Sequence, residues 1–404
     1  MQTWQRNLYT LLVAELVAVA GFTVVLPFLP YYVQELGVTE LEQVEFWSGL
    51  LFASKAIAMA IFSPIWGSIA DRYGRKLMVE RAMFGGAVVM GAMGFVQNVQ
   101  QLVFLFALQG CLTGTIAAAT TLVASSVPRQ RSGRALGLLQ VAVYSGASAG
   151  PLLGGLVADH FGYRAAFVVT GALLFLAGMT VAIFVHEEFE PPRREAGSRR
   201  SGFWLGVRAV FRSRELLVVL GIELMMRLGT RIIGPLLPLF VQTLVPSEAR
   251  VASLVGLITG LGAATSAVGA VLLGRASDRF GYRTVLLTCA LGMAVVYVPQ
   301  FFVTTPTQLL ILQAAAGAAM GGGLAAMRAL LANLSPKGRQ GAVYGLDWSA
   351  VSVASGLGPM IGVAVAVGLG LRASFLFAAG IYGLAALVVA GAVSNRQPEQ
   401  AKSP

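Results

Sequence analysis

Charged side chains interrupt several long apolar stretches of this sequence, and they are the residues best suited to do chemistry. Seven such positions occur: Glu15, Lys55, Glu223, Arg227, Arg231, Arg328 and Asp347. A charge in an apolar layer is costly unless it is paired or faces water, so such positions mark candidate sites. A carboxyl group in a medium of low dielectric constant can load and release protons near neutral pH. We expect Asp347 to carry a proton because its own apolar stretch contains no cation, with Glu15 and Glu223 as the next candidates.

Each of these charges also has a purely structural interpretation. Glu223 and Arg227 are four residues apart, which places them on one face of a helix where they could form an ion pair. Glu15 could likewise neutralise Lys55 on the adjacent segment. Arg328 could contact a substrate or hold the carboxylate of the next segment, which would make that carboxylate structural.

The apolar stretches that position these charges are long enough to cross a membrane. Hydrophobic residues make up 56% of the sequence and charged residues 12%, with a mean hydropathy of +0.75, unlike soluble globular proteins. A hydrocarbon layer of about 30 Å needs about 20 apolar residues per span. The sequence predicts an all-α integral membrane protein with twelve transmembrane helices, at residues 8–34, 46–70, 77–97, 100–126, 134–158, 162–186, 215–243, 250–276, 282–303, 306–333, 340–367 and 371–393.

Basic residues are distributed unevenly between the two sets of connecting loops. Most lie in the loops after even-numbered spans, which the positive-inside rule places in the cytoplasm together with both termini. The net charge of +11 follows from this topology, because no soluble domain is predicted that could carry a basic surface for nucleic acid. The polar segment after the sixth span has the composition of a linker. We therefore expect an N-terminal bundle at 1–186, a cytoplasmic linker at 187–214 and a C-terminal bundle with a short cytoplasmic tail at 215–404.

The sequence contains an internal repeat. LPFLPYYVQEL at 26–36 recurs as GPLLPLFVQTL at 234–244, and YRAAF at 163–167 recurs as LRASF at 371–375, each with an offset of 208 residues. Glu15 and Glu223 are separated by the same 208 residues. One six-span unit has been duplicated, and both copies have the same orientation because six spans return the chain to its starting side. We expect a binding cavity between them.

A charged turn follows the second span. The segment GSIADRYGRK at 67–76 contains Gly67, Asp71, Arg72, Gly74, Arg75 and Lys76, and it recurs as GRASDRFGYR at 274–283 with Asp278 and Arg279. A glycine at position 67 allows another helix to approach closely, and an acidic residue at position 71 suits the positive N-terminus of a neighbouring helix. The basic residues could pair across the interface between the halves, or they could only mark the cytoplasmic side.

Small residues follow one face of the fifth span. Gly146, Gly150 and Gly154 recur every four residues in GASAGPLLGG at 146–155, which allows close packing against another span. Pro151 removes one helical hydrogen bond and bends the helix, and Gly155 completes the pattern.

These two motifs resemble those of the major facilitator superfamily, and within it the twelve-span drug:proton antiporters. The turn is similar to the superfamily's GxxxDRxGRK signature, the fifth span resembles the GxxxGPxxGG antiporter motif, and the resemblance covers essentially the whole chain. It implies two pseudo-symmetric six-helix bundles, a turn that latches a cytoplasmic gate, and proton-coupled export of amphipathic small molecules or drugs by alternating access. One departure is FALQG at 106–110, where Phe106 replaces the family's usual arginine and Gln109 is retained.

The expected substrate cavity combines charged, polar and aromatic residues of the spans. We assign to it Arg328, Arg231, Arg227, Lys55, Gln109, Phe22, Tyr144 and Trp348. Four cations face three acids within the spans, so an exporter or flippase of an anionic metabolite or lipid-linked glycolipid is an alternative function. A non-transporting membrane receptor or scaffold is a second alternative.

The sequence shows no signature of covalent or metal chemistry. No phosphate loop, nucleophile triad or metal-ligand cluster is apparent, so we expect no enzyme activity, no cofactor and no metal. The expected partners are a small-molecule substrate, protons and the lipid bilayer, and no nucleic acid. The resemblance implies a monomer that crosses the bacterial inner membrane many times.

Overall fold

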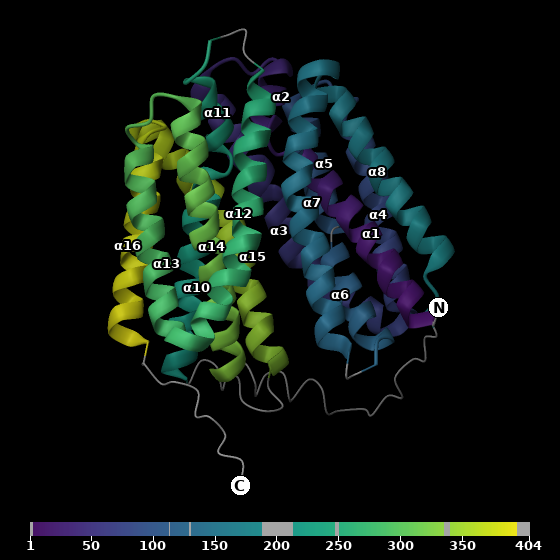
Figure 1. Ribbon diagram of the computed structural model, residues 1–404. Coiled ribbons are helices and arrows are strands. Elements are labelled where there is room, and N and C mark those ends of the chain that lie inside the picture. The colour runs from purple at the N-terminus through teal and green to yellow at the C-terminus, as the bar shows by residue number, and fades with distance from the viewer. Residues whose placement is uncertain are drawn as a thin grey trace. The chain divides into compact units, whose positions relative to one another are not determined.

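The structure is a computed structural model that describes residues 3–112, 114–128, 131–187, 213–246, 250–334 and 340–393, and its elements in these ranges are α-helices (Figure 1). The first repeat forms α1 (Thr3–Val24), α2 (Leu29–Glu35), α3 (Leu41–Tyr73), α4 (Arg75–Met93), α5 (Val99–Leu112), α6 (Thr115–Ser126), α7 (Ser132–Phe161) and α8 (Tyr163–Phe184). The second forms α10 (Arg214–Ile233), α11 (Leu236–Gln242), α12 (Val251–Phe280), α13 (Tyr282–Gln300), α14 (Pro306–Leu334), α15 (Gln340–Leu369) and α16 (Ala373–Ala392).

Ten segments within the described ranges are helical, long and apolar enough to cross a membrane. They comprise α1, the first part of α3, α5 together with α6, α7, α8 and α12 to α16. The helices α4 and α10 have similar lengths, but α4 carries Arg75, Lys76, Glu80 and Arg81, and α10 carries its own series of charges. The outer face of α4 is still apolar, since Val88 is 72% exposed. The predicted all-helical membrane architecture is confirmed.

Some predicted spans are built from two consecutive helices. The chain leaves the α-helical pattern at residues 25–28 between α1 and α2, and at Gly234 and Pro235 between α10 and α11. Proline lacks the N–H group that a continuous helix requires, which explains breaks at Pro27 and Pro235. Because Pro27 and Pro235 are 208 residues apart, both repeats break their first span at the same place.

Single glycines reverse the chain between long helices. Gly74 separates α3 from α4 with φ 98° and ψ 160°, and Gly281 separates α12 from α13 with φ 88° and ψ 147°. Only glycine adopts this region without a large steric penalty. The charged turn and its second copy therefore both require glycine for a backbone reason.

Helix pairings are the same in both repeats. In the first repeat, α1 packs on α7, and α4 and α1 both pack on α8 (Figure 1). In the second, α10 packs on α15, and α13 and α10 both pack on α16. These are equivalent pairs under the 208-residue offset, so the duplication seen in the sequence extends to the packing.

Contacts divide the chain into two compact units that differ from the sequence repeats in one region. The first unit contains residues 1–194 and 235–264, and the second contains residues 195–234 and 265–404. Residues 235–264 cluster with the first unit because α11 meets α2 and the first part of α12 packs on α7. The boundaries of the two bundles predicted from the sequence stay a prediction.

Candidate functional site

An ion pair lies on α10, in the second unit. Arg227 and Glu223 are one helical turn apart, and Nε of Arg227 donates to Oε1 of Glu223 at 2.5 Å. The Glu223 side chain is 1% exposed, and its other carboxylate oxygen has no hydrogen-bond partner among the described residues. The ion pair that the four-residue spacing allows is therefore present.

Asp347 lies on α15, within electrostatic reach of this pair and of Arg328 on α14. Its side chain is 8% exposed, and Oδ1 has no hydrogen-bond partner in the described part of the chain. Within that part, no ion pair joins Asp347 to Arg328. The tight pair that would have made Asp347 purely structural is absent from this structure.

Arg231 and Arg328 differ from Arg227 in being exposed. Arg231 lies one turn beyond Arg227, and its Cβ is so close to α15 that a Cβ added at Gly358 would lie 2.5 Å from it. Of these two exposed cations in the second unit, Arg328 is within electrostatic reach of Asp347, whereas Arg231 lies beside Gly358 of α15.

Glu15 is the corresponding acid of α1, in the first unit. Its side chain is 0% exposed and faces the side chain of Thr115 at the start of α6. Neither carboxylate oxygen has a partner with hydrogen-bond geometry among the described residues. The Nζ atom of Lys55 lies 5.8 Å from the ring centroid of Phe22, in a cation–π contact. The ion pair between Glu15 and Lys55 that the sequence allowed is not formed.

The uncharged residues assigned to the cavity are spread over several helices. Gln109 on α5 is 1% exposed, and its Nε2 lies 3.4 Å from the sulfur of Met90. Phe106, which stands where the family usually has arginine, is 1% exposed. Tyr144 is half-buried on α7. Trp348 lies on α15, but its side chain is outside the described part of the structure.

The glycine face of α7 packs against α1, as the predicted close approach requires. A Cβ added at Gly146 would lie 2.5 Å from the backbone oxygen of Leu16. A Cβ at Gly150 would collide with Thr23 Oγ1 and the backbone oxygen of Ala20, and one at Gly154 would collide with the Val24 backbone. The sequence identified this face, and the structure identifies α1 as its partner.

The end of the antiporter motif contacts α12 within the first unit. A Cβ at Gly155 would collide with the backbone oxygen of Ala252, and one at Gly256 would collide with that of Pro151. Oδ2 of Asp159 accepts a hydrogen bond of 2.7 Å from the backbone N–H of Ser253 in the first turn of α12. The fifth span therefore packs tightly against two helices through different glycines.

The charged turn is described in part. Gly67, Asp71, Arg72 and Asp278 lie on described helices, but their surroundings are outside the described part of the structure. Arg279 is exposed, with its guanidinium 5.5 Å from the ring centroid of Phe280.

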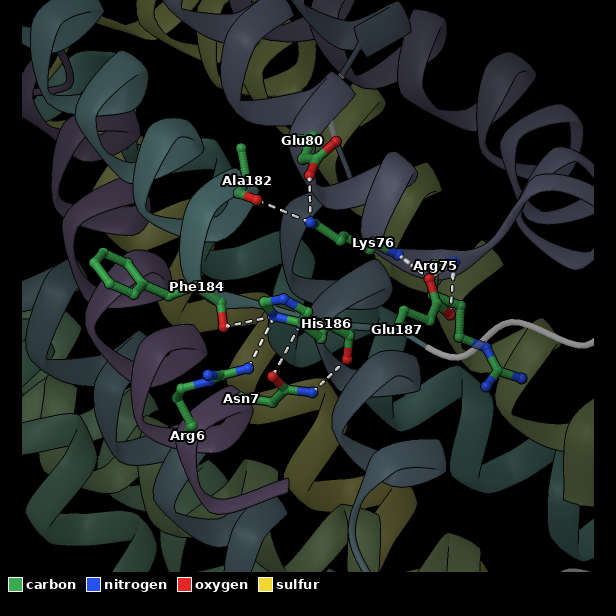
Figure 2. A network of polar contacts seen from close by, with 9 residues as sticks. All are labelled: Arg6, Asn7, Arg75, Lys76, Glu80, Ala182, Phe184, His186 and Glu187. Atoms are coloured by element: carbon green, nitrogen blue, oxygen red, sulfur yellow. Dashed lines mark hydrogen bonds and ion pairs between the residues drawn. The ribbon is translucent and has the colours of Figure 1, made fainter. Parts of the chain in front are cut away.

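Arg75 and Lys76 begin α4 and make their contacts within the first unit. Their backbone N–H groups donate to the carboxylate of Glu187 at 2.7–3.0 Å, where an anion is favoured by the helix dipole. Figure 2 shows the Lys76 side chain reaching Oε1 of Glu80 at 3.4 Å and donating to the backbone oxygen of Ala182 at 2.9 Å. These contacts of Lys76 tie α4 to α8. The predicted pairing of the basic residues across the two halves stays a prediction.

The same network continues to the start of α1 (Figure 2). Asn7 and His186 exchange two hydrogen bonds, from Asn7 Nδ2 to the His186 oxygen at 2.6 Å and from the His186 N–H to Asn7 Oδ1 at 3.0 Å. Nη2 of Arg6 lies 2.9 Å from Nδ1 of His186. This network could not be predicted from the sequence, because Glu187 and Asn7 are far from the turn in the chain and belong to no repeated motif.

Metal chemistry has no candidate centre among the described residues, which contain no group of three or more His, Cys, Asp or Glu side chains able to hold an ion.

Comparisons with known proteins agree with the helical membrane fold and with the motifs of the charged turn and the fifth span. The family model of the Major Facilitator Superfamily matches residues 11–247 and 219–404. Multidrug resistance protein MdtG of Salmonella dublin is 37% identical over 382 residues, which cover 94% of this chain and 93% of that protein. The MdtG protein of Klebsiella pneumoniae (strain 342) is also 37% identical, over 94% of this chain and 91% of its own.

Solved structures show the same fold at low sequence identity. A bacterial homologue of the human lysosomal transporter Spinster, in an inward-facing and unoccupied conformation, superposes with a TM-score of 0.80 at 16% identity, over 96% of both chains. The nucleoside transporter NupG superposes with a TM-score of 0.79 at 13% identity, over 96% of this chain and 99% of NupG.

Proposed function

The chain belongs to the major facilitator superfamily, and we propose that it is a proton-coupled secondary active transporter that exports amphipathic small molecules by alternating access. The multidrug resistance proteins that resemble it over nearly their whole length support drugs as the exported class. The family is one of transporters and not of enzymes. The observation that supports the proton coupling is Asp347, a buried carboxyl group inside a membrane-spanning helix, one oxygen of which has no partner among the described residues.

Asp347 is the proposed proton carrier because it combines burial with residual access to solvent. Its exposure of 8%, against 0% for Glu15, supports proton exchange at Asp347, and its charge is sensed by Glu223, Arg227 and Arg328. Glu15 is 0% exposed and has no counter-ion within the described residues, so a proton on it stays in place until the surrounding helices move. Glu223 ranks lower because Arg227 neutralises it directly.

The glycine face of α7 and the charged turn are proposed to act in alternating access. The tight packing of α7 against α1 and α12 supports a role for the antiporter motif in sealing the protein against leakage. The charged turn, with Gly67, Asp71 and Arg72 and its second copy around Asp278, is proposed to latch the cytoplasmic gate. The anchoring of α4 by Glu187 supports this role because it holds the start of that helix in place.

The protein is a multi-pass bacterial membrane protein, as its apolar helices and its relatives indicate. We propose that it lies in the inner membrane as a monomer with both termini in the cytoplasm. This orientation follows from the basic loops after even-numbered spans. Its proposed partners are a small-molecule substrate, protons and lipid.

Proton-coupled export is tested in proteoliposomes that contain the purified full chain and an entrapped pH-sensitive dye. An outward gradient of N-phenyl-1-naphthylamine, an uncharged amphipathic probe, is expected to move protons inward through the wild-type protein. The Asp347→Asn variant is expected to lose proton movement and uphill export while it retains binding of the probe.

The control variant Glu35→Gln removes an exposed carboxylate that pairs with Arg164 at 3.3 Å, and it is expected to move protons like the wild type. Asp347→Asn with normal uphill export and normal pH dependence would move the assignment to Glu15 and Glu223. Probe binding without any proton or probe movement in the wild type would instead favour a receptor or scaffold.

A further inference from the structure

Arg231 occupies a packing position that the first repeat fills with a small residue. Its counterpart is Thr23, 208 residues earlier, and the glycines beside them, Gly358 and Gly150, are also 208 residues apart. In both repeats the side chain starts against the glycine face of the partner helix. Thr23 Oγ1 donates a hydrogen bond of 2.8 Å within its own helix, to the backbone oxygen of Val19. The duplicated position therefore has no structural need for a long cation.

The guanidinium of Arg231 has no hydrogen-bond or ion-pair partner among the described residues. Its charged neighbour in that part of the chain is Arg227, which carries the same charge and is already paired with Glu223. Asp347 interacts with Glu223, Arg227 and Arg328, so the proposed proton carrier does not neutralise Arg231. Arg227 and Arg328 each interact with a carboxylate, whereas Arg231 interacts with no opposite charge among the described residues.

An unpaired arginine inside a predicted span is costly unless it faces water or a bound anion. Arg231 is surrounded by protein atoms and packs at its Cβ against Gly358, yet it keeps accessible surface, and we take that surface as the part a ligand would contact. Guanidinium presents several N–H donors in a planar fork that matches carboxylate, phosphate and sulfonate oxygens better than an ammonium group does.

We propose that Arg231 binds the anionic group, a carboxylate, phosphate or sulfonate, of an amphipathic ligand. This inference rests on the proposed function, because it extends the exported compounds to amphipathic anions. The same oxyanion chemistry could come from a free compound or from the headgroup of an anionic lipid, and the experiment distinguishes these sources.

Two fluorescent probes with one ring system isolate the contribution of charge. 8-Anilinonaphthalene-1-sulfonate carries a sulfonate, and N-phenyl-1-naphthylamine is its uncharged parent. Binding is measured to the full chain in nanodiscs of phosphatidylcholine, with the signal of empty nanodiscs subtracted. Arg231→Gln is expected to lower the affinity for the sulfonate relative to the parent by about tenfold, which corresponds to about 1.4 kcal/mol. Arg231→Lys is expected to lower this relative affinity by less, because lysine keeps the positive charge but lacks the planar fork of N–H donors.

The control is Arg250→Gln, which removes an exposed arginine just before α12 and is expected to leave the ratio of the two affinities unchanged. An unchanged ratio in Arg231→Gln overturns the inference. An equal loss of both probes in Arg231→Gln and Arg231→Lys also overturns it, since the residue would then serve only packing.

A second arm adds phosphatidylglycerol to the nanodiscs. Displacement of the sulfonate probe by this lipid in the wild type, but not in Arg231→Gln, supports the anion site and identifies a lipid headgroup as a competing source. Without displacement, the Arg231-dependent ratio supports a free anionic compound. Proton movement driven by the uncharged parent probe through the wild type tests the proposed function separately, so either idea can fail while the other stands.

Discussion

Replacing Gly150 by alanine should loosen the packing of α7 on α1. The added Cβ would collide with Thr23 Oγ1 and the backbone oxygen of Ala20. At the neighbouring Gly146 the corresponding gap can be measured: a Cβ would lie 2.5 Å from the Leu16 oxygen, where ordinary contact begins at 3.4 Å, so α1 must move by 3.4 − 2.5 = 0.9 Å. Backbone atoms cannot rotate away as a side chain can, and overpacking of this kind costs about 1–3 kcal/mol.

The matched control is Gly137→Ala on the same helix, because a Cβ there meets no atom within 4 Å. A helical glycine in open space should gain up to about 1 kcal/mol from alanine. We expect Gly150→Ala to lower the thermal unfolding midpoint in detergent and to slow proton-driven export, with Gly150→Leu blocking export altogether. Gly137→Ala should keep export and should leave the unfolding midpoint unchanged or slightly higher. If Gly150→Ala and Gly137→Ala behave alike in both assays, the close-packing argument is wrong.

The remaining predictions concern the charged turn and its anchor. Gly74→Ala should destabilise the protein by about 1–3 kcal/mol, measured as a lower unfolding midpoint, because alanine is strained at φ 98° and ψ 160°; an unchanged midpoint would show that the turn can adopt another conformation. Glu187→Ala should speed hydrogen exchange of the Arg75 and Lys76 amides by about tenfold, since their acceptor is lost; equal exchange would mean that water replaces the carboxylate at no cost. Asp71→Asn should slow export at near-normal expression, and unchanged export would separate this residue from the gate.

Much of the architecture was predictable because the membrane imposes a one-dimensional rule. A helix that crosses lipid must be about 20 residues long and apolar on the outside. The positions of the spans can therefore be predicted from apolar stretches of that length in the sequence. The same rule misses α4 and α10 when only composition is counted, because their charges are turned toward protein or water. The count of apolar stretches in the sequence nevertheless included both spans, at 77–97 and 215–243, and the 208-residue repeat gives each an apolar counterpart in the other copy.

Contacts within one helix were also predictable, whereas contacts between helices were not. The pair Glu223–Arg227 follows from a spacing of four residues, which fixes both side chains on one face of α10. The possible pair Glu15–Lys55 needed α1 and α3 to turn these side chains toward each other, and instead Lys55 contacts Phe22. Hydropathy does not specify how far each helix rotates about its axis, so this pairing could only be decided by the fold.

The sequence by itself determined an all-helical membrane protein, its duplication, its family resemblance and the glycine face of the fifth span. These features depend on composition, period and motif, which are local properties of the chain. Only the tertiary structure showed that this face packs on α1, that Glu187 anchors α4, and that Arg231 has no counter-ion among the described residues. Such contacts join residues far apart in the chain, and the rotation and close approach of whole helices decide whether they form.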